Sequence, residues 1–291
     1  MTDSTDALRL GVERLYAHPK GEPLPGDAAD VVSRLLALLE DGTLRSAVRD
    51  PGGTWGAVPW VKRGILVAFR AGKIVPVSGP GGAKVTKGAP SAFLDKHNLP
   101  TREFHANAGV RVVPGGSAIR RGAFVAPGVV CMPPMYINVG AFVGAGTMID
   151  SHALVGSCAQ VGERVHLSAA AQIGGVLEPI NASPVVVEDD VVVGGNCGIY
   201  EGTVVRKRAV LGAGVVLTRG TPVFDLVNER TIRADADTPL EIPENAVVVP
   251  GARAVTSEWG QSNGLSLYTP VIVKYRDERT DAATALEEWL R

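Results

Sequence analysis

An aliphatic residue returns at every sixth position between Val113 and Val223. An α-helix repeats about every 3.6 residues and an extended strand every two, so neither predicts a strict period of six. A period of six is typical of hexapeptide repeats in a parallel β-helix, where each repeat supplies one short strand and one turn. The alternative, a sandwich of irregular strands, would need eighteen positions to fall in phase by chance. The positions are Val113, Ile119, Val125, Cys131, Ile137, Val143, Ile149, Val155, Val161, Leu167 and Ile173 in a first phase, and Val187, Val193, Ile199, Val205, Leu211, Leu217 and Val223 in a second.

The residue that follows the inward-facing position is often small or turn-forming. Gly and Asp tolerate the positive φ angles that tight corners need, and we expect such angles here. Three repeats make one triangular coil, and coils stack at the strand spacing of about 4.8 Å, which predicts about six coils in a prism roughly 30 Å tall. The residues at this place include Gly144, Asp150, Gly156, Gly162, Gly174, Gly194 and Gly212.

The phase breaks once, between Ile173 and Val187, which lie fourteen residues apart. Two hexapeptides would take twelve residues, so the sequence predicts two extra residues and a loop that bulges from the prism within 174–184. Loops on a rigid scaffold often carry function, although a tolerated insertion explains the spacing equally well.

The repeats divide the chain into three expected domains, at 1–108, 109–226 and 227–291. The first is predicted to be mostly helical, with helices at 7–17 and 27–41, a helix or strand at 61–70, and a loop at 79–89. The third is predicted to contain an irregular polar segment at 228–244, a strand and turn at 247–251, a loop at 259–264, a strand at 265–276 and a helix at 281–291.

Composition narrows the class of protein. The net charge of −1 gives no basic footprint for nucleic acid. No apolar run approaches the ~20 residues of a membrane span, and the polar N-terminus does not read as a signal peptide. Three cysteines without a pairing pattern fit free thiols in a reducing compartment. We therefore expect a cytoplasmic protein with neither a nucleic-acid nor a membrane partner.

A prism lined by Val and Ile leaves no interior cavity, so any active site must lie on its outer surface. Flat apolar faces favour packing against other copies of the chain, and closed cyclic symmetry is the usual result. We therefore expect an oligomer, most simply a homotrimer of prisms.

Several short motifs on this repeat closely resemble the tetrahydrodipicolinate N-succinyltransferases, acyl-CoA-dependent enzymes of the succinylase branch of lysine biosynthesis. The resemblance runs from about Thr54 to the C-terminal strand and is densest between Arg111 and Gly202. The motifs are Arg-Val-Val-Pro at 111–114, Arg-Gly-Ala-Phe-Val-Ala-Pro at 121–127, Gly-Thr-Met-Ile-Asp at 146–150, Gly-Ser-Cys-Ala-Gln at 156–160 and Gly-Gly-Val-Leu-Glu-Pro at 174–179.

The resemblance implies a left-handed parallel β-helix, a homotrimer, and three active sites between adjacent prisms. It implies that succinyl-CoA, a co-substrate rather than a permanently bound cofactor, donates its succinyl group to the amine of L-2-amino-6-oxopimelate, the opened form of tetrahydrodipicolinate. Arg111 and Asp150 match the family's substrate-binding positions. A guanidinium suits a dicarboxylate acceptor, and a carboxylate can orient the attacking amine and accept its proton. A turn-capping role is the structural alternative for Asp150.

The sequence departs from the family at the second carboxylate. Members of the family carry a functional Glu three residues before a Glu-Gly pair, and here that place is Gly198. Glu201 is the nearest candidate for the catalytic role, and Glu178 on the bulge is the next, as a substrate-binding residue; either could instead be structural.

Coenzyme A needs cations for its phosphates and backbone donors for its thioester. Residues 249–253, Val-Pro-Gly-Ala-Arg, resemble the turn after the last coil of many hexapeptide acyltransferases, so Arg253 is a candidate for a phosphate. Gly-rich corners can donate N–H groups to an oxyanion, and Gly174 and Gly212 are the candidate positions. The basic run Arg206–Arg208 could also meet a phosphate, although a solvated corner is the simpler interpretation.

His152 and His166 raise the possibility of a zinc site, as in carbonic anhydrases on the same kind of prism. Such a site needs three histidines and a second shell of hydrogen bonds, and the other histidines lie outside the repeats, so we expect no metal. Two alternatives to succinyl transfer stay open. One is acetyl transfer to the same acceptor, and the other is a non-catalytic scaffold, against which the polar Asp150 and Gln160 argue mildly.

Overall fold

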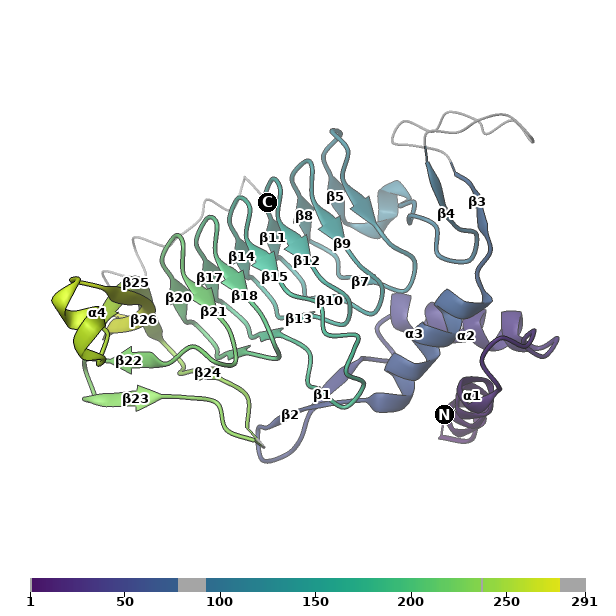
Figure 1. Cartoon of the computed structure of the whole chain (residues 1–291). Coiled ribbons are helices and arrows are strands. Elements are labelled where there is room, and N and C mark those ends of the chain that lie inside the picture. The colour runs from purple at the N-terminus through teal and green to yellow at the C-terminus, as the bar shows by residue number, and fades with distance from the viewer. Residues whose placement is uncertain (1, 78–92, 237, 278–291) are drawn as a thin grey trace.

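The chain is mainly β, and its short parallel strands wrap into a three-sided prism (Figure 1). The computed structural model describes residues 2–77, 93–236 and 238–277. Over these residues no helix has the length and apolar character needed to cross a membrane. The loop expected at 79–89 and the helix expected at 281–291 lie outside the described residues.

The prism has three faces, each made of parallel strands two residues long. The first face holds β5 (Arg111–Val112), β8 (Val130–Cys131), β11 (Met148–Ile149), β14 (His166–Leu167), β17 (Val192–Val193) and β20 (Val210–Leu211). The second holds β6 (Ala118–Ile119), β9 (Tyr136–Ile137), β12 (Leu154–Val155), β15 (Gln172–Ile173), β18 (Gly198–Ile199) and β21 (Val216–Leu217). The third holds β7 (Phe124–Val125), β10 (Phe142–Val143), β13 (Gln160–Val161), β16 (Val186–Val187), β19 (Val204–Val205) and β24 (Glu241–Ile242). The chain visits the faces in this order, and we name each corner by the two faces that it joins.

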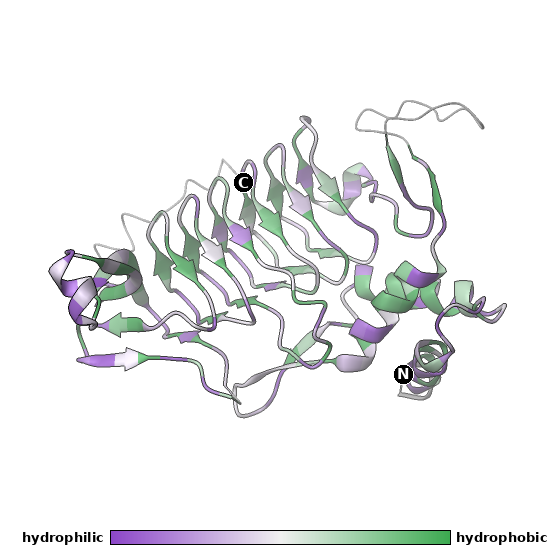
Figure 2. Ribbon diagram, viewed as in Figure 1, coloured by the Kyte–Doolittle hydropathy of each residue, from purple (hydrophilic) through white to green (hydrophobic). Residues whose placement is uncertain are grey.

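Residue pairing confirms the coil of three hexapeptides. Phe124 pairs with Phe142, and Phe142 with Gln160, so strands eighteen residues apart lie side by side. The second residue of each strand from β6 to β21 faces inward. All the predicted inward positions are buried except Val113, which is half-buried and out of register, because its neighbour Val112 pairs with Cys131. Hydrophobic residues follow the strands along the prism (Figure 2) and form its core.

Two steric conditions shape the corners, and they fall on different residues. At several corners glycine directly follows the inward position, and a Cβ there would collide with the next coil. At Gly144 it would lie 2.5 Å from the carbonyl carbon of Gly162, and at Gly156 2.2 Å from the amide nitrogen of Gly175. The left-handed φ comes two residues later, as in His152 at 64°. The expected positive φ at the first corner residue is therefore wrong. Close stacking of the coils requires glycine at these corners, whereas other corners carry larger residues at the same place.

The insertion is longer than the sequence period indicated. β16 follows β15 on the neighbouring face, so a single corner spans the fourteen residues from Ile173 to Val187. The normal spacing is six, which makes the insertion eight residues rather than the predicted two. Counting in sixes cannot reveal whether one corner or two lie within such a gap.

The six-residue period stops before the prism does. After β21, instead of continuing onto the third face, the chain forms an antiparallel pair, β22 (Val223–Asp225) and β23 (Arg230–Ile232). It then returns as β24, where Glu241 pairs with Val204. Val223 is in phase and buried in the prism's core, but its strand β22 pairs with β23 rather than with a strand of the third face. The domain boundary expected at 226 stays a prediction. The segment 228–244, predicted to be irregular, contains β23 and β24.

The C-terminal strands extend the first face. β25 (Ala246–Ala254) begins beside β20 and then pairs antiparallel with β26 (Ser266–Tyr275). The strands predicted at 247–251 and 265–276 are thereby confirmed, the first being longer than expected. The loop predicted at 259–264 is instead largely a short helix, α4 (Glu258–Ser262), whose first turn is capped by the Ser257 hydroxyl.

The N-terminal helices pack against the second–third corner near the start of the prism (Figure 1). They are α1 (Thr2–Ala17), α2 (Ala28–Glu40) and α3 (Pro59–Ala71), which confirms both predicted helices and makes 61–70 helical. Their core, with Leu35 and Ile65 at its centre, includes Val139 and Cys158 from the prism. This core is separate from that of the prism, which fits a domain boundary near residue 108; that boundary stays a prediction. The remaining elements here are β1 (Ala47–Arg49) paired with β2 (Trp55–Ala57), β3 (Ile74–Pro76) paired with β4 (Leu94–Lys96), and the 3₁₀ turn η1 (Ala106–Ala108).

A buried carboxylate ties the C-terminal strands together. Asp225 accepts hydrogen bonds from Asn228, from the Tyr275 hydroxyl at 2.8 Å and from Arg230 Nε at 3.0 Å. Burial alone would raise the pKa of Asp225, but these donors outweigh it and hold the pKa at about 2. Because the folded state lowers this pKa, the ionised group stabilises the fold above about pH 4, and that contribution is lost as the pH falls towards 2.

We predict that Asp225→Asn lowers the free energy of unfolding at pH 7 by about 2 kcal/mol, the size of a shift of nearly two pKa units. The variant should also lose less stability than the wild type between pH 4 and pH 2. Urea unfolding at several pH values measures both effects, with the exposed Glu103→Gln as control. Parallel pH profiles for the wild type and Asp225→Asn would contradict the assignment.

Candidate functional site

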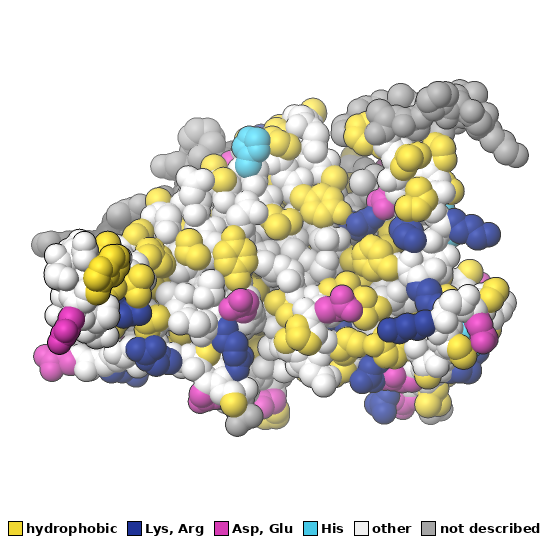
Figure 3. All heavy atoms as spheres, in the orientation of Figure 1, with side chains coloured by type: hydrophobic (Ala, Val, Ile, Leu, Met, Phe, Trp, Pro, Cys, Tyr) yellow, Lys and Arg dark blue, Asp and Glu magenta, His cyan; other side chains and the backbone are white. Residues whose placement is uncertain are grey.

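Charged residues are sorted among the three corners of the prism. The six segments of the first–second corner, at 114–117, 132–135, 150–153, 168–171, 194–197 and 212–215, contain Asp150 and no other Asp, Glu, Lys or Arg. Charged side chains gather towards the lower edge of the view in Figure 3, away from the upper edge of the prism. The third–first corner carries Glu163, Arg164, Glu188, Asp189, Asp190, Arg206, Lys207, Arg208 and Glu244.

Asp150 begins the corner after β11 and is half-buried. Its backbone N–H donates to the carbonyl of Leu167 in the next coil, which fixes its position. Its Oδ1 accepts a hydrogen bond from the amide of Ser151 at 2.7 Å, so the turn-capping role is present. One carboxylate oxygen caps the turn, and the other has no hydrogen-bond partner among the described residues and can meet a ligand.

The same corner offers backbone donors. The amide N–H groups of Ala169, Gly195 and Ala213 have no acceptor within the described part of the chain. Each is the second residue of its corner segment, where the N–H points away from the coil stack. A developing negative charge near this corner could therefore be stabilised by hydrogen bonds from the backbone.

Arg111 lies on the side of the prism that leads to Asp150. It is the outward residue of β5 and pairs with Val130. Val130 pairs in turn with Met148 of β11, the strand that ends just before Asp150. The strand of Arg111 and the strand that precedes Asp150 are therefore two strand spacings apart, or about 10 Å. The Arg111 residue is exposed. A ligand with carboxylates at both ends could span this distance.

Glu201 and Glu178 lie elsewhere, on the second–third corner. The Glu201 carboxylate accepts the amide of Arg219 at 2.8 Å. It lines a cavity of about 640 Å³ that also includes Arg219 and Arg233. Glu178 is exposed on the inserted loop. One chain therefore does not bring either glutamate together with Asp150, and their roles stay predictions.

The position of the missing second carboxylate is filled by a ring. Gly198 is the outward residue of β18, and a Cβ there would lie 2.4 Å from Cε2 and 2.8 Å from Oη of Tyr200. The same ring covers Gly174, whose Cβ would lie 2.8 Å from Tyr200 Cδ1. Tyr200 thus closes this part of the second face, and any larger side chain at 198 would have to displace it.

The predicted cofactor positions are far apart along the chain's surface. The amides of Gly174 and Gly212 donate to Ile199 and Val248 in the next coil, so these N–H groups are not available to a thioester. Arg253 lies on β25, beyond the last coil, and its buried Nε has no partner among the described residues. Contact of these three residues with coenzyme A stays a prediction.

The basic residues of the run Arg206–Arg208, at the third–first corner, lie close to carboxylates of the same chain. Arg206 pairs with Glu188 at 3.0 Å and with Glu241 at 2.8 Å, and Lys207 lies 3.9 Å from Asp190. This arrangement favours the structural interpretation of the run. Among the described residues no three His, Cys, Asp or Glu side chains are grouped to hold a metal ion.

The inserted loop is held by the N-terminal helices through Lys62, which sequence reasoning did not identify. Lys62 on α3 is fully buried, and its Nζ donates to the carbonyls of Pro179 at 2.9 Å and Ala182 at 2.8 Å. Burial lowers the pKa of Lys62, an effect that the nearby Cys158 partly opposes. On its other side the loop lies close to Gly202, where an added Cβ would be 2.7 Å from the carbonyl oxygen of Ser183. Lys62 therefore fixes one wall of the Glu201 cavity.

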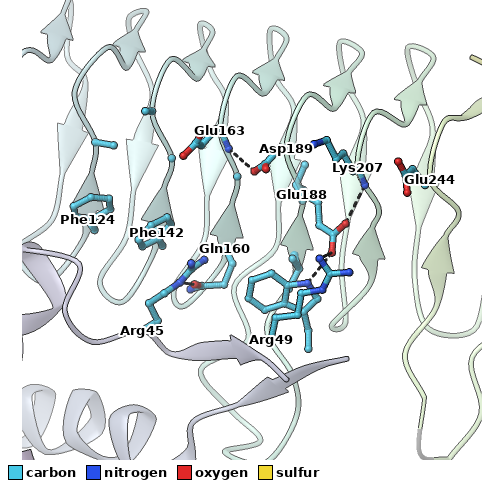
Figure 4. Close-up of a pocket in the computed structure, with 17 residues that line it drawn as sticks. Arg45, Arg49, Phe124, Phe142, Gln160, Glu163, Glu188, Asp189, Lys207 and Glu244 are labelled. Atoms are coloured by element: carbon cyan, nitrogen blue, oxygen red, sulfur yellow. Dashed lines mark hydrogen bonds and ion pairs between the residues drawn. The ribbon is translucent and has the colours of Figure 1, made fainter. Parts of the chain in front are cut away.

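A second cavity, of about 420 Å³, lies between the third face and the β1–β2 hairpin (Figure 4). Arg45 Nε donates to Gln160 Oε1 at 2.8 Å, and its guanidinium lies 3.7 Å from the ring centre of Phe142. Trp55 on β2 donates from Nε1 to Glu188 at 2.9 Å. No sequence pattern marks this cavity, because the residues that pair across it lie more than 100 positions apart.

Known proteins match this chain over most of its length. A family model described as "Tetrahydrodipicolinate N-succinyltransferase N-terminal" matches residues 12–71, and one described as "Hexapeptide repeat of succinyl-transferase" matches residues 184–219. The 2,3,4,5-tetrahydropyridine-2,6-dicarboxylate N-succinyltransferase of Rhodopseudomonas palustris is 40% identical over 267 residues, which cover 91% of each chain. The relative of the same name from Chelativorans is 38% identical over 292 residues, covering 100% of this chain and 99% of its own.

One solved structure shows the same fold. It is a Campylobacter jejuni chain described as a 2,3,4,5-tetrahydropyridine-2-carboxylate N-succinyltransferase, with a TM-score of 0.51 and 16% identity. The match covers 84% of this chain and 62% of that one. At this identity the likeness concerns the fold alone.

We predict that Lys62→Met lowers the free energy of unfolding by about 2 kcal/mol, because two buried carbonyls lose their donor. Hydrogen exchange at residues 176–184 should quicken more than elsewhere, since the loop loses its anchor. Lys207→Met, which removes a half-exposed lysine, is the control. Unchanged exchange in the loop would show that Lys62 does not hold it.

Proposed function

The chain belongs to the tetrahydrodipicolinate N-succinyltransferase family, and we propose that it transfers succinyl from succinyl-CoA to the amine of L-2-amino-6-oxopimelate, the opened form of tetrahydrodipicolinate. This step serves diaminopimelate and lysine biosynthesis. The observation that carries the proposal is the similarity of about 40% over 91% of the chain to relatives named for this reaction. The first–second corner supports it, since Asp150 is the only charged residue there and lies among free backbone donors.

The reaction forms a C–N bond and breaks a C–S bond. The neutral amine attacks the thioester carbonyl, the carbonyl oxygen gains negative charge, and the intermediate collapses to the amide and the coenzyme A thiol. In our proposal the free oxygen of Asp150 orients the amine and takes its proton, which finally reaches the thiolate sulfur. Arg111 binds a carboxylate of the acceptor, and exposed amides such as those of Ala169 and Gly195 stabilise the oxyanion.

We propose that three chains form the active enzyme, with the coils left-handed as in the hexapeptide family and against the usual right-handed crossover. The sorting of charge supports the trimer, because a corner with one charge and many small residues suits contact with another prism. Glu201 and Glu178 lie on another corner, so either could join Asp150 only from a neighbouring chain. The assignment of Glu201 as catalytic and of Glu178 as substrate-binding depends on that assembly.

Coenzyme A is the co-substrate in this proposal, and Arg253 is the residue best placed for a phosphate, because its Nε is without a partner. In this proposal Gly174 and Gly212 allow coenzyme A to approach the backbone closely, and their N–H groups do not bind it. We propose a cytoplasmic enzyme, in line with the three free cysteines, all buried.

Thiol release tests the proposal against its two alternatives. With the acceptor present, succinyl-CoA should give a kcat/KM at least about tenfold above that of acetyl-CoA, since the family is named for the succinyl donor. A preference for acetyl-CoA would show that acetyl-CoA is the donor. No thiol release with either thioester would favour a non-catalytic scaffold.

We predict that Asp150→Asn lowers kcat/KM by about 100-fold or more, because the amide cannot accept the proton. Its Oδ1 can still accept the Ser151 amide, so melting should change little. Light scattering should give about 90 kDa for variant and wild type, three times the 30.3 kDa chain. Near-normal turnover would leave Asp150 with its turn-capping role only. Glu201→Gln, compared under the same conditions, should match this loss only if Glu201 supplies the second carboxylate from a neighbouring prism.

A further inference from the structure

The cavity under the β1–β2 hairpin plays no part in the reaction proposed above. Its walls are the third face, the third–first corner and the hairpin, whereas Asp150 lies on the first–second corner. At about 420 Å³ it falls within the usual size of small-molecule sites. Figure 4 shows Arg45 and Gln160 at one end and Glu163, Asp189, Lys207 and Glu244 towards the other.

Arg45 is a cation held ready at one end of the cavity. Gln160, only 1% exposed, accepts its Nε–H, and Gln160 is itself fixed by Ser46 and the carbonyl of Cys158. Burial lowers the pKa of Arg45 to about 10, although the charge of Asp189 acts in the opposite direction. The two Nη groups have no protein acceptor among the described residues. They form the planar fork that binds a carboxylate through two hydrogen bonds.

The other end of the cavity is acidic. Asp189 keeps one carboxylate oxygen for solvent while the other accepts the amide of Glu163 at 2.9 Å. Glu244 is exposed and has no ion pair within the described residues. The whole lining contains three cations, Arg45, Arg49 and Lys207, against four carboxylates, Glu163, Glu188, Asp189 and Glu244. Glu163 and Glu188 are paired with Arg164 and Arg206 outside the lining, so Asp189 and Glu244 remain for a cation. A ligand that carries both charges therefore fits both ends.

The wall between the two ends is apolar. Phe124 and Phe142 stack with their ring centres 4.5 Å apart, and Trp55 faces the same space from the hairpin. Arg45 lies 5.4 Å from the Trp55 ring centre, so the guanidinium is flanked by aromatic rings on two sides. Methylene groups of a ligand could pack on these rings.

We propose that this cavity binds an ω-amino acid, in which several methylene groups separate the ammonium from the carboxylate. Its carboxylate lies on the Arg45 fork, its methylene groups pack on the rings, and its ammonium faces Asp189 and Glu244. The ligand joins the N-terminal part of the chain to the prism, because Arg45 precedes β1 and the two carboxylates belong to the third–first corner. Binding therefore stabilises the contact between them, and it does not require the acyl-transfer site.

The test begins with thermal unfolding of the full chain in the presence of straight-chain ω-amino acids of increasing length, each at about 5 mM. At least one should raise the Tm, since a ligand that binds only the folded state stabilises it. Calorimetry then compares the best amino acid with its amine lacking the carboxylate and its acid lacking the amine. Each analogue should bind at least tenfold more weakly. No Tm increase with any amino acid, or equal binding of an analogue, would overturn the proposal.

Variants locate the site. Arg45→Lys keeps the charge but loses the fork and should weaken binding at least tenfold. Glu244→Gln, at an exposed position without an ion pair among the described residues, should weaken it about fivefold, while the distant Glu103→Gln should leave Kd unchanged. Asp150→Asn should also leave Kd unchanged, which separates this cavity from the acceptor site. Unchanged binding in both Arg45→Lys and Glu244→Gln, or its loss in Asp150→Asn, would place the ligand elsewhere.

Discussion

Stacking of inward aliphatic side chains is the interaction on which the rest of this structure depends. Each strand contributes one buried residue, and each buried residue lies above its equivalent in the previous coil, as Ile149 lies beside Cys131 and Leu167. The interior is filled in this way and has no room for a ligand. Every functional group must therefore be carried by an outward strand residue or by a corner. The inserted loop, the hairpin and the C-terminal strands are the parts that give those groups walls.

Stacking also restricts the corners, and this restriction separates structural from functional positions. At several corners the first residue is glycine, as at Gly144 and Gly156, because a Cβ there would collide with the next coil. The second residue presents a free N–H at Ala169 and Gly195, and the third takes the left-handed φ, as at His152. Asp150 is the exception on its corner, since the equivalent residues of the other coils there, Met132, Ser168, Gly194 and Gly212, carry no charge. That exception, on a corner with no other charge, is a physical reason to associate it with function.

The sequence predicted what is periodic and failed where the chain leaves the period. The six-residue repeat located the strands because burial imposes it residue by residue. It could not give the length of the insertion, nor show that the chain forms β22 and β23 before it returns to the third face, because a period counts residues and not positions in space. The contacts of Arg45 with Gln160 and of Lys62 with Pro179 join residues 115 and 117 positions apart. No local pattern marks such pairs, so both cavities were invisible in the sequence, although Asp150 and Arg111 were identified from their motifs.

The replacement of the second carboxylate by Gly198 changes what the second face can do. A glutamate at position 198 would need the space that the Tyr200 ring fills. The carboxylate is therefore absent and its place is taken by the Tyr200 side chain. The carboxylates that remain on the second–third corner are Glu201, engaged with the Arg219 amide, and the exposed Glu178. Since neither lies on the corner of Asp150, one chain offers a single carboxylate and a row of backbone donors at that corner. A reaction at this corner must therefore proceed with Asp150 alone or draw its second carboxylate from a neighbouring prism, and the response of Glu201→Gln distinguishes the two.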